Sequence, residues 1–185
     1  MEIGICLTGH RPQGLYGYNN YLLYKKLEDF LYDLIKKEID KFDLFYLSSG
    51  LALGADTCWT KAILRLRKEY PDKIKFYAHI PNFNQARKWI NKEDVRFWDY
   101  SIKQADKLFV IDEDMKYSHG VALNLRNQSM VDNSNLIIGI YNGEQKGGTF
   151  NCLEYAKKKD LSIRIFDPEY IRNLWYFKNN NKKEG

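Results

Sequence analysis

The alternation of short apolar runs with helix-like segments constrains the fold of this chain most strongly. Six runs have the length and composition of buried strands, at residues 3–7, 44–47, 74–80, 108–111, 136–141 and 162–166. Between them, apolar residues recur at helical spacing over 20–41, 55–70, 87–104, 121–131 and 149–158. This alternation predicts an α/β, Rossmann-like, doubly wound fold: a mainly parallel sheet of about six strands with helices on both faces.

The length of the chain, 185 residues, suits one domain with a sizeable core. No internal repeat or interdomain linker is visible. We expect residues 1–177 to form a single domain. Residues 178–185 are rich in Asn and Lys and contain no apolar residue, so we expect them to form a disordered polar tail.

Composition excludes several classes of protein. No apolar run approaches the length that spans a bilayer, so we expect no membrane partner. Three widely separated cysteines lack zinc-type spacing, which predicts reduced thiols, a cytoplasmic location and no metal or other cofactor. The net charge of +5 is dispersed along the chain, and on that ground we expect nucleic acid to be an unlikely partner.

Every distinctive loop of the chain follows a predicted strand. These loops span residues 8–12, 48–56, 81–84 and 143–149. In open parallel sheets, ligands bind outside the carboxyl ends of the strands, near the point where strand order reverses. We therefore expect the four loops to converge on one functional edge.

The loop after the second strand has the composition of an anion site. It contains Ser49, Gly50 and Gly54, and then Ala55 and Asp56 at the start of a helix. Glycines let the backbone approach an anion, and the free N–H groups of a helix N-terminus favour negative charge. The alternative is a tight turn without ligand. Asp56 is then a helix-capping carboxylate rather than an acceptor for ribose hydroxyls.

The loop after the first strand offers a second set of ligand groups. Thr8, Gly9, His10 and Arg11 supply a hydroxyl, an accessible backbone, an imidazole and a guanidinium. A guanidinium can bind phosphate through two parallel hydrogen bonds. A surface turn with solvated side chains is the alternative, and the position at a strand end favours ligand contact.

Two further features admit two interpretations each. Arg126, near the apolar face of a helix, belongs either to a buried salt bridge or to an anion site. Gly147, Gly148 and Thr149 precede a helix, so they form either another anion site or an ordinary N-cap.

Aromatic and histidine residues give weaker indications. Pro81 and Phe83 follow the third strand and could stack a base or belong to the core. His79 lies within that strand and is expected to be structural. The remaining histidines are scattered, which argues against a metal site.

Several of these segments resemble a known superfamily. Residues 49–56, Ser-Gly-Leu-Ala-Leu-Gly-Ala-Asp, look like the SG-[LM]-A-x-G-x-D motif of the DNA-processing protein DprA. Residues 123–130, with Gly147-Gly148-Thr149 and Glu154, are similar to the M-x-x-R-K and P-G-G-x-G-T-x-x-E motifs of LOG-type phosphoribohydrolases. Together these motifs define the SLOG superfamily, and the opening segment 8–12 most resembles its YpsA-like branch.

The resemblance implies a set of ligand-binding residues, and one departure from the LOG motif argues against the enzymatic function. It places Arg126 and Asn127 at the ligand, where Asn127 replaces the lysine of the LOG motif. It would make Arg126 and Glu154 the catalytic pair if the chain were an enzyme. Glu154, however, follows Thr149 by five residues instead of three, which rotates it by about 200° around a helix.

Three functions follow from the resemblance. The leading expectation is a protein that binds a nucleotide-derived small molecule, such as an ADP-ribose-like or cyclic nucleotide signal. It would act as a sensor or sequestering protein, in phage–host conflict for example. The second is a LOG-like N-glycosidase that acts on nucleoside monophosphates. The third is DprA-like binding of single-stranded DNA. Family members also self-associate, so a homo-oligomer is expected.

Overall fold

The computed structural model describes the backbone of residues 1–180 and the side chains of residues 1–174. Its centre is a six-stranded sheet in the order β4-β3-β2-β1-β5-β6, in which every neighbouring pair of strands is parallel. The strands are β1 (Glu2–Gly9), β2 (Leu44–Ser49), β3 (Ile74–Ile80), β4 (Lys107–Val110), β5 (Leu136–Ile140) and β6 (Ser162–Phe166). The expected α/β, Rossmann-like fold is confirmed.

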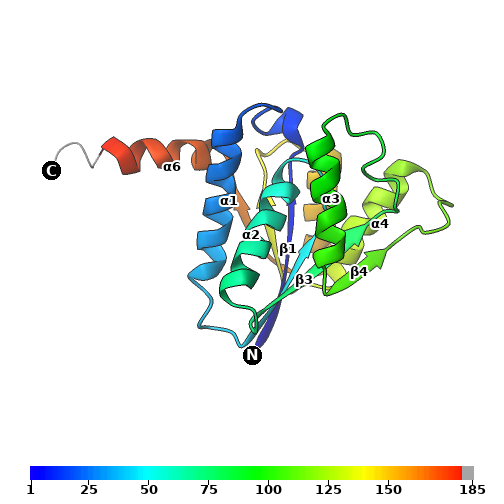
Figure 1. Cartoon of the computed structure of the whole chain (residues 1–185), viewed down its shortest axis with the longest axis horizontal. Coiled ribbons are helices and arrows are strands. Elements are labelled where there is room, and N and C mark those ends of the chain that lie inside the picture. The colour runs from blue at the N-terminus through cyan, green and yellow to red at the C-terminus, as the bar shows by residue number, and fades with distance from the viewer. Residues whose placement is uncertain (181–185) are drawn as a thin grey trace.

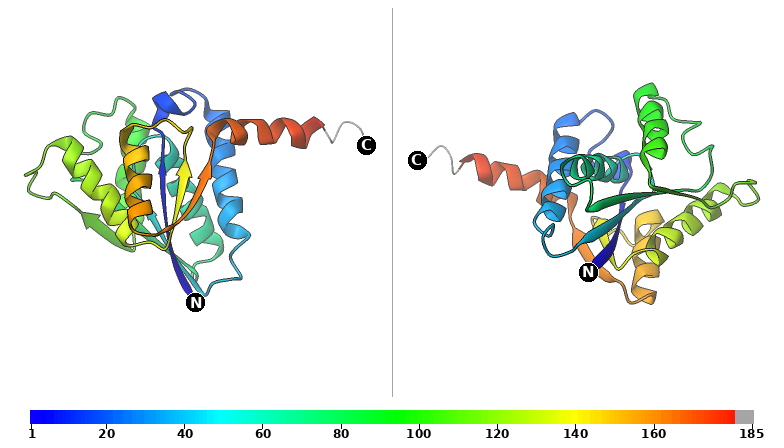
Figure 2. Two further views of the ribbon diagram at one scale, coloured as in Figure 1. Left: turned by 180° about the vertical axis from the view of Figure 1, so that it is seen from behind. Right: turned by 60° about the horizontal axis from the view of Figure 1, so that its bottom comes forward.

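Helices cover both faces of the sheet. They are α1 (Tyr21–Lys36), α2 (Ala55–Glu69), α3 (Lys92–Gln104), α4 (His119–Asp132), α5 (Gly147–Lys158) and α6 (Pro168–Asn180), with a short 3-10 helix η1 (Pro12–Gly14) after β1. Strands β1 to β4 are added in one direction, and right-handed crossovers then place α1, α2 and α3 on one face. The chain returns past β1 to β5, which places α4 and α5 on the opposite face (Figures 1 and 2).

The two faces have separate apolar cores. The larger core joins α1 and α2 to the sheet and contains fully buried Phe45, Trp59 and Phe76. The smaller core joins α4 and α5 to β1 and β5 around Met130 and Leu153. Because strands β1 to β3 and β5 are buried between helices, their sequences read as apolar runs rather than as an alternation of apolar and polar residues.

The structure moves several predicted boundaries. The first helix ends at Lys36 instead of Lys41, and the third begins at Lys92, because residues 84–89 form turns that precede Asn91, whose side chain caps the helix. Helix α6 had no counterpart in the prediction, and it extends away from the sheet beside α1 (Figure 1). It includes the first three residues of the expected tail 178–185, whose remainder lies outside the described residues.

The strand order reverses between β1 and β5. From β1 the chain proceeds to β2 on one side, and β5 pairs with β1 on the other, aligning Thr8 with Gly139 and Gly9 with Ile140. The connections after these two strands diverge to opposite faces of the sheet. A crevice therefore opens between their carboxyl ends, at the position where doubly wound sheets bind ligands.

His79 at the end of β3 has no exposed surface and stacks on Phe109, with ring centroids 4.2 Å apart. Its Nδ1 lies 3.0 Å from the Ser129 hydroxyl of α4. Burial, together with the nearby positive charge of Arg126, lowers its pKa to about 3. The prediction that His79 is structural agrees with this packing.

The lowered pKa of His79 predicts that stability depends on pH. Between about pH 3 and 6.5 the unfolded chain binds a proton at His79 that the folded chain does not, so stability falls as pH drops through this window. We expect His79→Gln to reduce the slope of unfolding free energy against pH by up to about 1.4 kcal/mol per pH unit. Urea titrations from pH 3.5 to 7 measure it, with His119→Gln at an exposed position as the control. Equal slopes for His79→Gln and wild type contradict the assignment.

Candidate functional site

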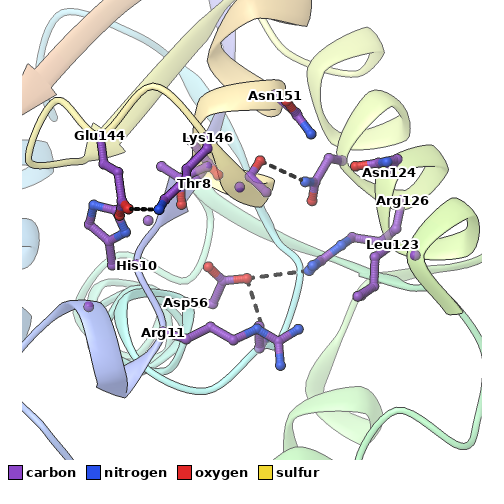
Figure 3. Close-up of a pocket in the computed structure, with 18 of the residues that line it drawn as sticks. Thr8, His10, Arg11, Asp56, Leu123, Asn124, Arg126, Glu144, Lys146 and Asn151 are labelled. Carbon is purple, nitrogen blue, oxygen red and sulfur yellow. Dashed lines mark hydrogen bonds and ion pairs between the residues drawn. The ribbon is translucent and has the colours of Figure 1, made fainter.

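A cavity of about 810 Å³ opens at the crevice between β1 and β5. Four segments form it: the loop after β1, the start of α2, one side of α4, and the loop that leads from β5 into α5 (Figure 3). Its size is that of small-molecule sites in proteins. Of the four loops expected to converge, three contribute residues to this cavity.

The loop after β1 lines the cavity with all four of its predicted residues, Thr8, Gly9, His10 and Arg11. The His10 ring stacks on Tyr141, with centroids 5.6 Å apart, and its Nε2 lies 2.7 Å from the Asn142 side-chain oxygen. These contacts orient the imidazole, whereas Arg11 is exposed.

Close packing brings the start of α2 to the β1 loop. The Ala55 N–H donates to the His10 carbonyl at 3.2 Å. Gly54 has a φ of 95°, and a Cβ there would lie 2.5 Å from the same carbonyl oxygen. A Cβ on Gly9 would lie 2.4 Å from the Ala55 Cβ. Gly9, Gly54 and Ala55 therefore let two backbones approach each other.

The cavity wall contains a buried ion pair between Asp56 of α2 and Arg126 of α4. Nη1 of Arg126 lies 3.4 Å from Oδ2 of Asp56, and each residue is only 5% exposed. The same carboxylate oxygen accepts a hydrogen bond from the Ala52 N–H at 3.3 Å. Gly50 makes room for the pair, because a Cβ there would lie 1.5 Å from Arg126 Nη1.

This pair leaves the guanidinium incompletely satisfied. Its Nε is buried and has no hydrogen-bond partner among the described residues. Burial raises the pKa of Asp56 and lowers that of Arg126, so for each group the loss of solvation outweighs the attraction of the partner. The nearby guanidinium of Arg11 adds positive potential, which an anionic ligand would neutralise (Figure 3).

The start of α5 supplies free backbone donors. Gly147, with a φ of 89°, Gly148 and Thr149 line the cavity, and no side chain caps this helix. The first amides of a helix that lack partners form a natural anion site. Asn127, which also lines the cavity, donates from its side chain to the Gly148 carbonyl at 3.4 Å and so joins α4 to α5.

The structure does not bring every candidate residue to the cavity. Ser49, Gly50, Gly54 and Ala55 lie behind its wall, where Ser49 accepts a hydrogen bond from the Leu51 N–H at 3.2 Å. These four residues shape the site by packing and do not line the cavity. Their direct contact with ligand stays a prediction.

Three other candidates also lie outside the cavity lining. Pro81 is buried and Phe83 is 54% exposed, and neither lines the cavity, because the loop after β3 runs toward α3. Glu154 lines a separate hollow between α4 and α5, and it accepts a hydrogen bond from Lys157 at 2.5 Å. The extra residues before Glu154 turn it away from the ligand site, as the helical rotation predicted.

The sequence analysis missed several residues that line the cavity. Glu144 and Lys146, from the loop after β5, form an ion pair of 3.2 Å near His10 (Figure 3). Asn124 of α4 and Asn151 of α5 also line the cavity. Helical spacing from Arg126 could have identified Leu123 and Met130 as part of the cavity wall.

Residues 1–180 were compared with the requirements of a metal site and of a membrane-spanning helix. No group of three or more His, Cys, Asp or Glu residues there is arranged to bind a metal ion. No helix in the same range combines the length and apolar content needed to cross a bilayer.

The chain matches a protein-family model over almost its whole length. The model, YpsA, is described as the YspA SLOG family and matches residues 5–173. The chain belongs to this family. The resemblance to the SLOG superfamily and to its YpsA-like branch is thereby confirmed.

Individual relatives carry little functional description. The SPbeta prophage-derived protein YoqJ of Bacillus subtilis (strain 168), named as uncharacterized, is 32% identical over 168 residues, which cover 82% of this chain and 95% of that protein. A UPF0398 protein of Bacillus cereus (strain B4264) is 27% identical over 163 residues, covering 84% of this chain and 83% of the relative.

Solved structures of DNA processing protein A share the fold. The protein from Streptococcus pneumoniae gives a TM-score of 0.57 at 19% identity, over 88% of this chain and 50% of that one. The protein from Helicobacter pylori, described for its single-stranded DNA binding mode, gives 0.59 at 14% identity, over 98% of this chain and 81% of that one. The chain thus spans half the length of the first protein.

These neighbours correct one expectation. Dispersed positive charge led us to expect that nucleic acid is an unlikely partner, and that expectation is wrong, because the fold is shared with a protein described as binding single-stranded DNA. Net charge averages over the whole surface, whereas a nucleic acid contacts the local cations of one site.

The buried ion pair gives a prediction about stability. Asp56→Asn leaves the Arg126 guanidinium buried without a counter-charge, and we expect a loss of about 3–5 kcal/mol in unfolding free energy. Adding Arg126→Met removes the unpaired charge, so the double variant should be more stable than the sum of the two single losses.

Urea denaturation of the four proteins measures this coupling. The exposed pair of Arg96 with Glu93 is a matched control, and Glu93→Gln should change the free energy by less than about 0.5 kcal/mol. Strictly additive losses at Asp56 and Arg126 would show that the two charges do not depend on each other.

Proposed function

We propose that this chain binds a nucleotide-derived small molecule that carries phosphate and ribose, in the cavity at the carboxyl ends of β1 and β5. The observation that carries the proposal is the buried Arg126 guanidinium. Among the described residues its Nε has no partner, and Asp56 is the one carboxylate paired with it. A ligand phosphate would supply the missing acceptors. The uncapped start of α5 is a second anion site on the same cavity.

The remaining groups of the cavity suit the rest of a nucleotide. Asp56 and Glu144 offer acceptors for ribose hydroxyls, and the amides of Asn124 and Asn151 offer both donors and acceptors. An ADP-ribose-like or cyclic nucleotide signal fits this mixture of cations and polar neutral groups. The volume of about 810 Å³ accommodates a molecule of that size.

The proposed role is that of a sensor or sequestering protein. Hydrolysis of a nucleoside monophosphate in the LOG manner would require Glu154, which lines another hollow and is bound to Lys157. The relationship to a protein named as prophage-derived supports a role in phage–host conflict.

Calorimetric titration with AMP, cyclic AMP, ADP-ribose, cyclic ADP-ribose and NAD tests the proposal. We expect at least one of them to bind, and Arg11→Ala to weaken it by at least about tenfold, since a charge-assisted hydrogen bond contributes roughly 1.5–3 kcal/mol. Arg11 is exposed, so the variant should fold as the wild type does. Arg96→Ala, an exposed arginine of α3, is the matched control.

Chromatography of the incubated mixtures separates binding from cleavage. An intact ligand is the expected result. Recovery of free base and ribose phosphate would overturn the sensor assignment. No binding of any nucleotide, or equal loss in both arginine variants, would overturn the site.

Binding of single-stranded DNA is a second candidate, favoured by the fold shared with the Helicobacter pylori protein described for its single-stranded DNA binding mode. If the cations Arg11, Arg126 and Lys146 each neutralise one phosphate, log affinity should fall against log salt with a slope of about −2. Fluorescence anisotropy with a labelled oligothymidylate measures the slope. A strand that does not bind even at low salt removes this candidate.

A further inference from the structure

A second cleft lies across η1 from the cavity. It has a volume of about 290 Å³ and is formed by the segment around η1 and the starts of α1, α2 and α3, which meet at the top of Figure 1. We call it the tyrosine cleft, lined among others by Pro12, Tyr18, Tyr21, Tyr24, Lys61 and Asp94.

The aromatic side chains of this cleft are unusually accessible. Tyr18 is 56% and Tyr21 is 73% exposed, whereas Tyr24 is held in place by a hydrogen bond of 2.7 Å from its hydroxyl to the Gly17 carbonyl. Exposed aromatic rings of this kind can serve as platforms on which nucleobases stack. The lining of the main cavity, by contrast, includes no Phe, Tyr or Trp.

The charged groups of the cleft leave one ammonium available. Glu28, which also lines it, is paired with Lys25 at 3.0 Å and with Arg65 at 2.7 Å. Lys61 makes no ion pair within the described residues and lies 5.4 Å from the centroid of the Phe97 ring. It can contact a phosphate, while the Asp94 carboxylate can accept from an amino group of a base.

A short ridge separates the two sites. Residues Pro12–Gly14 form a single 3-10 turn, which is about 6 Å long along its axis. Arg11 and Gln13 of this segment line the main cavity, and the Gln13 amide donates to the Tyr18 hydroxyl at 2.5 Å. One sugar–phosphate unit can cross such a ridge, with Arg11 placed at its phosphate.

We propose that the tyrosine cleft is a second base-binding site, and that the ligand contains two nucleobases joined through phosphate. One nucleotide occupies the main cavity, the linking phosphate lies at Arg11, and the second base stacks on Tyr21, the more exposed of the two tyrosines. The inference rests on the nucleotide-binding role proposed for the cavity. The ligand chemistry is that of a dinucleotide or of two consecutive nucleotides of a single strand.

Calorimetric titration of the full chain with AMP, 5′-phosphorylated diadenylate and a longer oligoadenylate tests the second site. We expect diadenylate to bind at least about tenfold more tightly than AMP, the gain of one stacked base. Tyr21→Ala should remove most of this gain and leave the affinity for AMP unchanged. Tyr21→Phe keeps an aromatic ring and should retain it.

Tyr100→Ala is the matched control, because this tyrosine is 50% exposed on α3 and does not line the cleft. Affinity that levels off at two nucleotides identifies a dinucleotide, and affinity that rises further with length identifies a single strand. Either result supports the second site. Equal affinity for AMP and diadenylate, or equal effects of Tyr21→Ala and Tyr100→Ala, overturns it. Failure of AMP and of all the other nucleotides to bind would instead overturn the main cavity.

Discussion

The buried pair of Arg126 and Asp56 is the interaction on which the arrangement of the site depends. It joins α4, on one face of the sheet, to the start of α2, on the other, across the carboxyl edge. Two charges removed from water require a fixed geometry, because a displaced partner would leave the other uncompensated. Gly50 provides the space, and Leu51, with a φ of 53°, accepts a strained conformation beside it. The conformation of the loop after β2 thus places the Asp56 carboxylate next to the Arg126 guanidinium.

The order of the strands determines which loops can meet there. Because β1 and β5 are neighbours while their connections leave on opposite faces, Arg11 and Gly147 approach the same crevice from different sides. The loop after β3 lies two strands away from β1, and its Phe83 is accordingly outside the cavity. The loop after β2, which is next to β1, still reaches the cavity through Ala52 and Asp56, whereas the loop after β3 does not.

The sequence allowed the fold to be predicted because its signals are local. Apolar runs define six strands, and Ile74–Ile80 and Ser162–Phe166 were predicted to the residue. Helix α6 was missed, and of its described side chains, those of residues 168–174, Ile171 belongs to the core. Thr8 and Arg11 were predicted as site residues because they directly follow a strand. The order of the strands in the sheet, however, cannot be predicted from any local sequence pattern. The difference between lining a cavity, as Asp56 does, and packing behind it, as Gly54 does, depends on contacts between segments far apart in sequence.

The carboxylates of the cavity bear on the choice between binding and cleavage. A general base needs a carboxylate that is free to accept a proton from water. Asp56 is committed to Arg126 and to the Ala52 N–H, and Glu144 to Lys146, while Glu154 is outside the cavity. Both carboxylates that line the cavity, Asp56 and Glu144, are thus already paired with a cation. Such paired charges suit recognition of a polar ligand, which is the role proposed for this site.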